Sequence, residues 1–192
     1  MNRPEKITRT ITDFEKLPIQ FPTHMHPPEF WEQLGRTIGT FGFLEEILAK
    51  AILVFTGTTP YTEDKIQEAY EEWDRKLERT LTDPLYHLAN TYQKAVKSNP
   101  ASTIEDIDDL VSMIKESIKI RNVLCHGSWN QTPDANGASI PFYFRKEGND
   151  QLEFETPINI MFLKQTQKQV ADLCCKVIKS VTDMGYQFPG GS

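Results

Sequence analysis

Apolar residues recur at helical spacing along the first long segment of the chain. Between Glu29 and Phe55 they step by three, four or seven positions, the repeat of one helix face. These positions are Phe30, Leu34, Ile38, Phe41, Leu48, Ile52 and Phe55. Gly57 and Pro60 predict the end of this helix. Five prolines interrupt residues 1–28, which we therefore predict to be an N-terminal arm.

Two more long segments carry the same helical pattern. One covers residues 62–98, and Pro84 within it predicts a kink or a break near Asp83, because proline cannot continue a helix ladder. The other covers residues 159–184 and places branched apolar residues on one side. Both segments are long enough to pack against the first helix.

The third helix in chain order has signals at both ends. Ser102 and Glu105 have the spacing of a capping box, so we predict that the helix starts there. Its predicted end is Cys125 or His126, because Gly127 follows as a stop signal. This helix carries the candidate chemistry of the chain.

Two short runs after the third helix alternate in character and predict a β-hairpin. They cover residues 140–145 and 152–156, within a hairpin region of about 139–156. The predicted fold class is all-α: an antiparallel bundle of four to five helices with a small inserted hairpin. We expect one helical domain over residues 29–188, preceded by the arm of residues 1–28.

A stripe of small side chains runs along the first helix. Gly35, Gly42 and Ala49 recur every seven residues and so share one face. Glycine inside a helix costs roughly 1 kcal/mol relative to alanine. The stripe predicts that a second helix backbone approaches closely, and drift on an exposed face is the alternative. It also offers one candidate dimer face, the third and fourth helices being the other.

Composition and charge narrow the function classes. The 192 residues are 39% hydrophobic and 25% charged, with a formal net charge of −6. Because the overall field repels phosphate, nucleic acid must be contacted through a local basic patch, and no DNA binding is predicted. Three cysteines without regular spacing, no signal-peptide pattern and no bilayer-length apolar run predict a cytoplasmic protein without membrane contact.

A polar stripe flanks the apolar sector of the third helix. Lys115, Lys119, Asn122 and His126 are four, three and four residues apart, so they share this stripe. Two lysines leading to an asparagine and a histidine suit a ligand that carries phosphate. A histidine side chain exchanges protons near neutral pH and can serve in attack by a ribose 2′-hydroxyl. Simple capping of the helix end is the alternative for His126.

Arg121 interrupts the apolar sector of the same helix. It follows Ile114 by seven residues, and a buried guanidinium needs a partner. One interpretation is a structural ion pair within the fold. The other is a guanidinium presented at the mouth of a cleft to bind phosphate.

The segment from Arg121 to Gly127, read as Arg-Asn-Val-Leu-Cys-His-Gly, resembles the Arg-x(4–6)-His motif of the HEPN superfamily. In that family a polar residue commonly follows the arginine, as Asn122 does here, and the motif lies late in the third long helix. Trp129, shortly after the motif, also resembles many members. The resemblance covers about residues 29 to 186 and leaves out the arm and the hairpin.

The resemblance implies a metal-independent endoribonuclease that works as a homodimer with a composite active site. Arg121 would bind and polarise the scissile phosphate, and Asn122 would orient the phosphate or the histidine. His126 would perform acid–base work or position the ribose, and the products would carry 2′,3′-cyclic phosphate and 5′-hydroxyl ends. Lys115 and Lys119 are the candidate substrate-binding residues. Bacterial members are often toxins or anti-phage defence effectors, held by an antitoxin or another regulatory partner. The alternatives are an inactive dimerisation scaffold or a nucleotide-binding regulatory domain.

Neither a metal nor a cofactor is predicted. His24 and His26 could pair two imidazoles, but no acidic or cysteine residue stands near them at ligand spacing. Cys125 beside His126 does not predict a thiol dyad, because successive helical residues point about 100° apart. The sequence has no glycine-rich loop that would cradle a phosphate.

Overall fold

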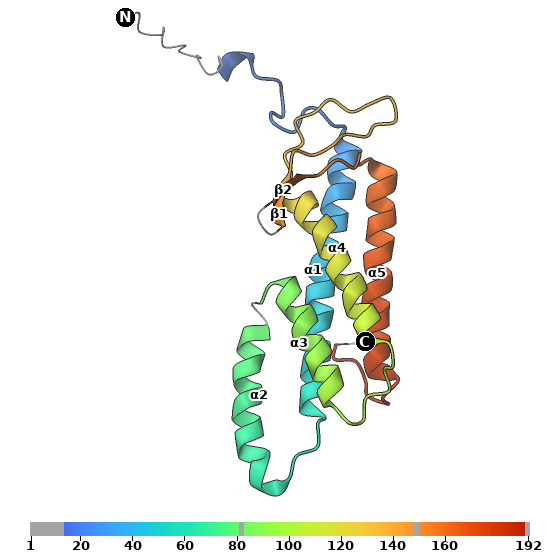
Figure 1. Cartoon of the computed structure of the whole chain (residues 1–192). Coiled ribbons are helices and arrows are strands. Elements are labelled where there is room, and N and C mark those ends of the chain that lie inside the picture. The colour runs from blue at the N-terminus through green and yellow to red at the C-terminus, as the bar shows by residue number, and fades with distance from the viewer. Residues whose placement is uncertain (1–13, 81–82, 148–149, 191–192) are drawn as a thin grey trace, which may run out of the picture.

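The chain folds into helices joined by loops, with one small hairpin (Figure 1). A computed structural model describes residues 14–80, 83–147 and 150–190. The helices are α1 (Pro28–Gly57), α2 (Ile66–Thr80), α3 (Leu85–Ser98), α4 (Ile107–His126) and α5 (Ile160–Thr182), and the strands are β1 (Phe144–Glu147) and β2 (Asp150–Glu153). Short 3-10 turns cover Phe14–Lys16 and Glu63–Lys65. The predicted all-α class is confirmed for the described part of the chain.

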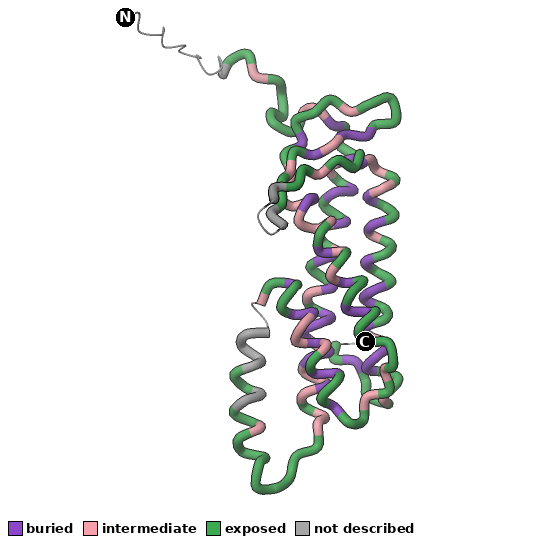
Figure 2. The backbone as a smooth tube through the Cα atoms, in the orientation of Figure 1, coloured by how far each residue is buried: buried purple, intermediate pink, exposed green. Residues whose placement is uncertain are grey.

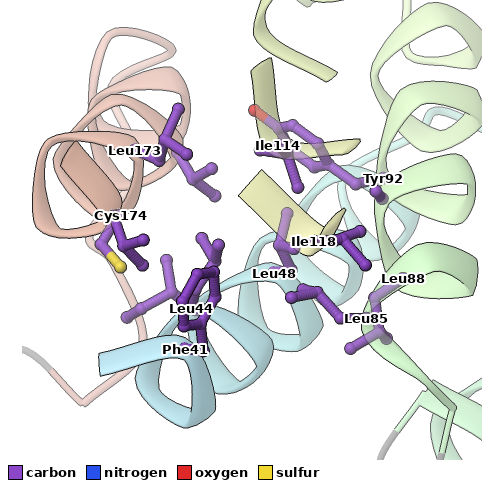
Figure 3. Close-up of a cluster of buried hydrophobic side chains, with 14 of the residues drawn as sticks. Phe41, Leu44, Leu48, Leu85, Leu88, Tyr92, Ile114, Ile118, Leu173 and Cys174 are labelled. Atoms are coloured by element: carbon purple, nitrogen blue, oxygen red, sulfur yellow. The ribbon is translucent and has the colours of Figure 1, made fainter. Parts of the chain in front are cut away.

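Helix α1 is the longest element, and the other long helices lie along it (Figure 1). Its ends, and those of α5, fall within two residues of the predicted boundaries. Apolar side chains of α1, α3, α4 and α5 meet in one core (Figure 3). The labelled members are Phe41, Leu44, Leu48, Leu85, Leu88, Tyr92, Ile114, Ile118, Leu173 and Cys174. Their burial from water is the main force that holds these helices together.

Buried polar groups between the helices are satisfied by one another. The Thr37 hydroxyl lies 3.2 Å from the carbonyl oxygen of Leu163, joining α1 to α5. The phenol of Tyr92 donates to the hydroxyl of Ser180 at 2.7 Å, joining α3 to α5. Burial raises the pKa of Tyr92 to about 12, so this phenol stays protonated and can keep donating.

The predicted interruption of the second helical segment is confirmed. Helix α2 ends at Thr80, and α3 begins at Leu85 directly after Pro84. Residues 81–82 lie outside the described part. Figure 2 shows that most of the described residues of α2 are exposed. Helix α3, by contrast, contributes buried residues to the core that it shares with α1.

The predicted start of α4 is wrong. The helix begins at Ile107 after Asp106, and Ser102 makes no cap to it. Asn99 explains the difference, because its buried side chain donates to the carbonyl oxygen of Phe55 at 2.8 Å. The same side chain accepts from the amide of Ala101 at 2.9 Å. This anchor to the end of α1 holds the following residues in a non-helical connection.

The hairpin is present, but its predicted strands are shifted. The antiparallel register pairs Arg145 with Leu152, and residues 148–149 between the strands lie outside the described part. The residues expected at the start of the first strand pair elsewhere: Phe142 bridges to Ser128, immediately beyond the end of α4. The segment before β1 is therefore hydrogen-bonded through its backbone to the loop that follows α4.

The small-residue stripe was predicted to contact a second helix backbone, and within a single chain this prediction is wrong. A methyl group added at Gly35 or Gly42 would meet nothing within 4 Å, and the same holds for Gly39. Ala49, one repeat further on, is buried. The stripe is thus covered at Ala49 and open at Gly35 and Gly42.

Candidate active site

Helix α4 ends at the histidine of the predicted motif. The amide of Gly127 donates to the carbonyl oxygen of Val123 at 2.8 Å, which closes the last turn. His126 is therefore the last helical residue, and its side chain is exposed. The predicted helix end is confirmed. The imidazole has no hydrogen-bond partner among the described residues, so both ring nitrogens are open to a ligand.

Gly127 is required by a close approach of the chain. A Cβ atom at this position would lie 2.6 Å from the carbonyl oxygen of Val123 and 2.8 Å from Cβ of Pro141. Replacement of Gly127 by alanine is expected to lower the free energy of unfolding by about 1–3 kcal/mol, the usual cost of overpacking. Urea denaturation measures this change. Gly35→Ala is the control, because nothing lies within 4 Å there; equal stability of the two variants would contradict the prediction.

Arg121 faces helix α1. Its Nη2 atom lies 3.7 Å from Oε1 of Glu45, and each of these side chains is 33% exposed. Its Nη1 atom donates to Oδ1 of Asn122 at 3.4 Å. Arg121 is therefore only half-buried, and these two long contacts leave much of its five-donor guanidinium free for a ligand. Glu45 was missed in the sequence, where a glutamate far along the chain carries no signal of this contact.

The predicted polar stripe of α4 divides in the structure. Lys119 and Asn122 line a cavity of about 1100 Å³ between α4, the hairpin and α5. Lys115 instead lies over the ring of Tyr86, with Nζ 5.3 Å from its centroid. Lys119 also forms an ion pair with Glu116, at 2.7 Å. The four stripe residues therefore do not converge on one cavity of the single chain.

The arm is tied to the loop that follows the motif. The buried ring of His26 stacks on Phe30, with centroids 4.1 Å apart, and lies edge-on to Trp129 at 6.0 Å. Its Nε2 atom is 3.1 Å from the hydroxyl of Ser139. Its buried Nδ1 atom has no hydrogen-bond partner among the described residues. Residues before α1 thus help to hold the chain just beyond His126.

Burial makes His26 a source of acid sensitivity. Desolvation lowers its pKa below the ordinary value of 6.5, so the folded chain binds a proton there less readily than the unfolded chain. As pH falls through 6.5 towards the lowered pKa, the unfolded state gains a proton first. We expect the contribution of the neutral, buried His26 to the free energy of unfolding to be present in full above pH 6.5. This contribution should decrease as the pH falls from 6.5 through the lowered pKa.

Urea midpoints at several pH values, with His26→Phe as the comparison, measure this effect. Phenylalanine keeps a ring against Phe30 and removes the titrating group. The acid-side decrease should therefore be smaller in the variant. Parallel pH profiles for the two proteins would show that His26 does not contribute.

The described residues hold no group of three or more histidine, cysteine or acidic side chains placed to bind a metal ion. In the same described part, no helix combines the length and apolar character needed to cross a membrane. Comparisons with family models, with curated proteins and with solved structures found no match to this chain. The evidence for the candidate site is therefore its own geometry and the motif.

Proposed function

We propose that this chain is a metal-independent endoribonuclease of the HEPN type, centred on Arg121, Asn122 and His126. The observation that carries the proposal is the end of α4. There an exposed histidine follows, by five residues, a half-buried arginine with unused donors. A proton-transferring imidazole and a guanidinium that binds phosphate are the two groups that transesterification of RNA needs.

The proposed reaction breaks the phosphodiester bond by attack of the neighbouring 2′-hydroxyl. An imidazole removes the 2′ proton as the 2′ oxygen bonds to phosphorus, and the bond to the 5′ oxygen breaks. A proton returned to that oxygen leaves a 5′-hydroxyl and a 2′,3′-cyclic phosphate. Arg121 stabilises the charge that develops on the phosphate oxygens. Asn122, whose Oδ1 accepts from Arg121, holds the guanidinium in place.

We further propose that the chain folds as an antiparallel helical bundle and that it works as a homodimer. One chain offers one His126, whereas removal and return of a proton at opposite sides of phosphorus suit two imidazoles. We propose that His126 of the partner subunit supplies the second. Lys115 and Lys119 remain candidate phosphate contacts, since Lys119 is 51% exposed despite its ion pair. A cytoplasmic toxin or anti-phage effector controlled by a protein partner is the biological setting we propose.

Cleavage of total RNA and tRNA in excess EDTA tests the proposal. The wild type should cleave and leave cyclic phosphate ends, and the double variant Arg121→Ala/His126→Ala should be inactive. His87→Ala, which removes an exposed histidine of α3, is the matched control and should remain active. Cleavage that survives the double replacement would refute the assignment of the site.

A second candidate function is a non-catalytic dimerisation scaffold. The contact between Arg121 and Glu45 favours it, because an ion pair joining α4 to α1 is also a structural element. In that case the wild type would not cleave RNA, and removal of Arg121 would weaken the fold. The stabilities of Arg121→Ala and Glu45→Gln in urea separate the two candidates.

A further inference from the structure

The cavity beside the motif helix is a long groove. Its α4 wall runs from Asp109 to Val123, and fourteen residue steps at about 1.5 Å each give roughly 21 Å. The volume of about 1100 Å³ exceeds the usual range of small-molecule pockets, about 300–1000 Å³. Residues on its apolar surface are Met113, Ile120, Tyr143, Leu152, Phe154 and Leu173. These dimensions fit about four turns of an added helix.

The groove continues along α4 and α5. A second hollow of about 380 Å³ shares Met113 and Leu173 with the first and adds Asp172 and Lys176. Met113 is 49% exposed and Leu152 is 40% exposed, so apolar surface of the groove is presented to solvent. A flexible methionine on an open apolar surface is typical of sites that receive a partner helix.

Acidic residues outnumber basic ones in the lining of this groove. The lining includes four acidic residues and two basic ones. The two basic residues are Lys119, which forms an ion pair with Glu116 at 2.7 Å, and Arg145 on β1. The carboxylates of Asp109, Glu153 and Glu155 have no cationic partner among the described residues. At Asp109, Glu153 and Glu155 the groove therefore favours a positively charged occupant over phosphate, whereas Lys119 on α4 remains a candidate phosphate contact.

We propose that this groove is the docking site for a basic amphipathic helix of a partner protein. The apolar face of the helix would cover the floor, and its lysine or arginine residues would meet the acidic rim. Single-stranded RNA is the less suitable occupant, because its phosphates would face the unpaired carboxylates. The proposal is independent of RNA cleavage: a catalytically inactive chain would bind the same helix.

Two synthetic peptides of about 18 residues test the groove. They share one leucine-rich face and carry either lysine or glutamate on the other, and fluorescence anisotropy measures their binding to the full chain. The basic peptide should bind saturably and at least about tenfold more tightly than the acidic one. The variant Glu153→Lys/Glu155→Lys should weaken this binding by at least about tenfold. Thermal melting of the variant confirms that it is folded.

Glu63→Lys/Glu68→Lys is the matched control, because it reverses two exposed charges near the start of α2, away from the groove. It should leave the affinity for the basic peptide unchanged. The proposal is overturned if neither peptide binds, if both bind equally, or if only the control variant loses binding. Displacement of the basic peptide by a single-stranded RNA would assign the groove to RNA. A dimer that Leu152→Glu converts to a monomer would assign it to a second copy.

Discussion

Replacement of Arg121 by alanine is expected to slow RNA cleavage by about 100- to 1000-fold, the usual loss when one donor to the reacting phosphate is removed. The free energy of unfolding should change by less than about 1 kcal/mol, because a long ion pair that is partly open to water is screened and contributes little. The contact to Glu45 is 3.7 Å long, and both side chains are 33% exposed. Single-turnover cleavage and urea denaturation measure the two effects separately.

Glu45→Gln is the matched control for Arg121. It removes the charge of the ion-pair partner and keeps the guanidinium beside Asn122. Cleavage should persist in this variant if Arg121 acts on phosphate. A loss of about 3 kcal/mol or more in both variants, as seen when a buried ion pair is broken, would instead make Arg121 a structural residue. The inactive scaffold would then be the function that the site supports.

Conversion of Gly35, Gly39 and Gly42 to alanine is expected to stabilise the chain by about 2–3 kcal/mol. Each glycine in a helix costs roughly 1 kcal/mol relative to alanine. No atom lies within 4 Å of the added methyl group at any of the three positions, so nothing opposes this gain. The melting temperature should rise by several degrees, since about 1 kcal/mol corresponds to about 2–4 °C at this chain length.

The same triple variant tests whether a second copy packs on the open face of α1. If the homodimer uses this face, three methyl groups would hold the helices apart and weaken association. The melting temperature would then fall, and it would depend on protein concentration. Analytical ultracentrifugation of both proteins separates the outcomes, since the expected result keeps the oligomeric state unchanged.

The accurate predictions from sequence came from local signals. The apolar repeat located α1 and α5, Pro84 marked the break before α3, and Gly127 marked the end of α4. Each signal acts within a few residues, through the side-chain period of a helix or through a backbone that cannot continue one. The capping-box prediction failed because Asn99 is anchored to the end of α1, a contact between segments far apart in the chain.

The candidate site also combines features that local signals predict with contacts between distant segments that they do not. Local signals were enough to predict that Arg121 and His126 lie late on one helix and that this helix ends at Cys125 or His126, because the helix period and a following glycine act within a few residues. The contact between Glu45 and Arg121 depends on how distant segments pack, and so do the different neighbours of Lys115 and Lys119. The acidic groove likewise forms because α4, the hairpin and α5 pack together. A helical repeat specifies the direction of a side chain, whereas its neighbours depend on which distant segment packs against that direction.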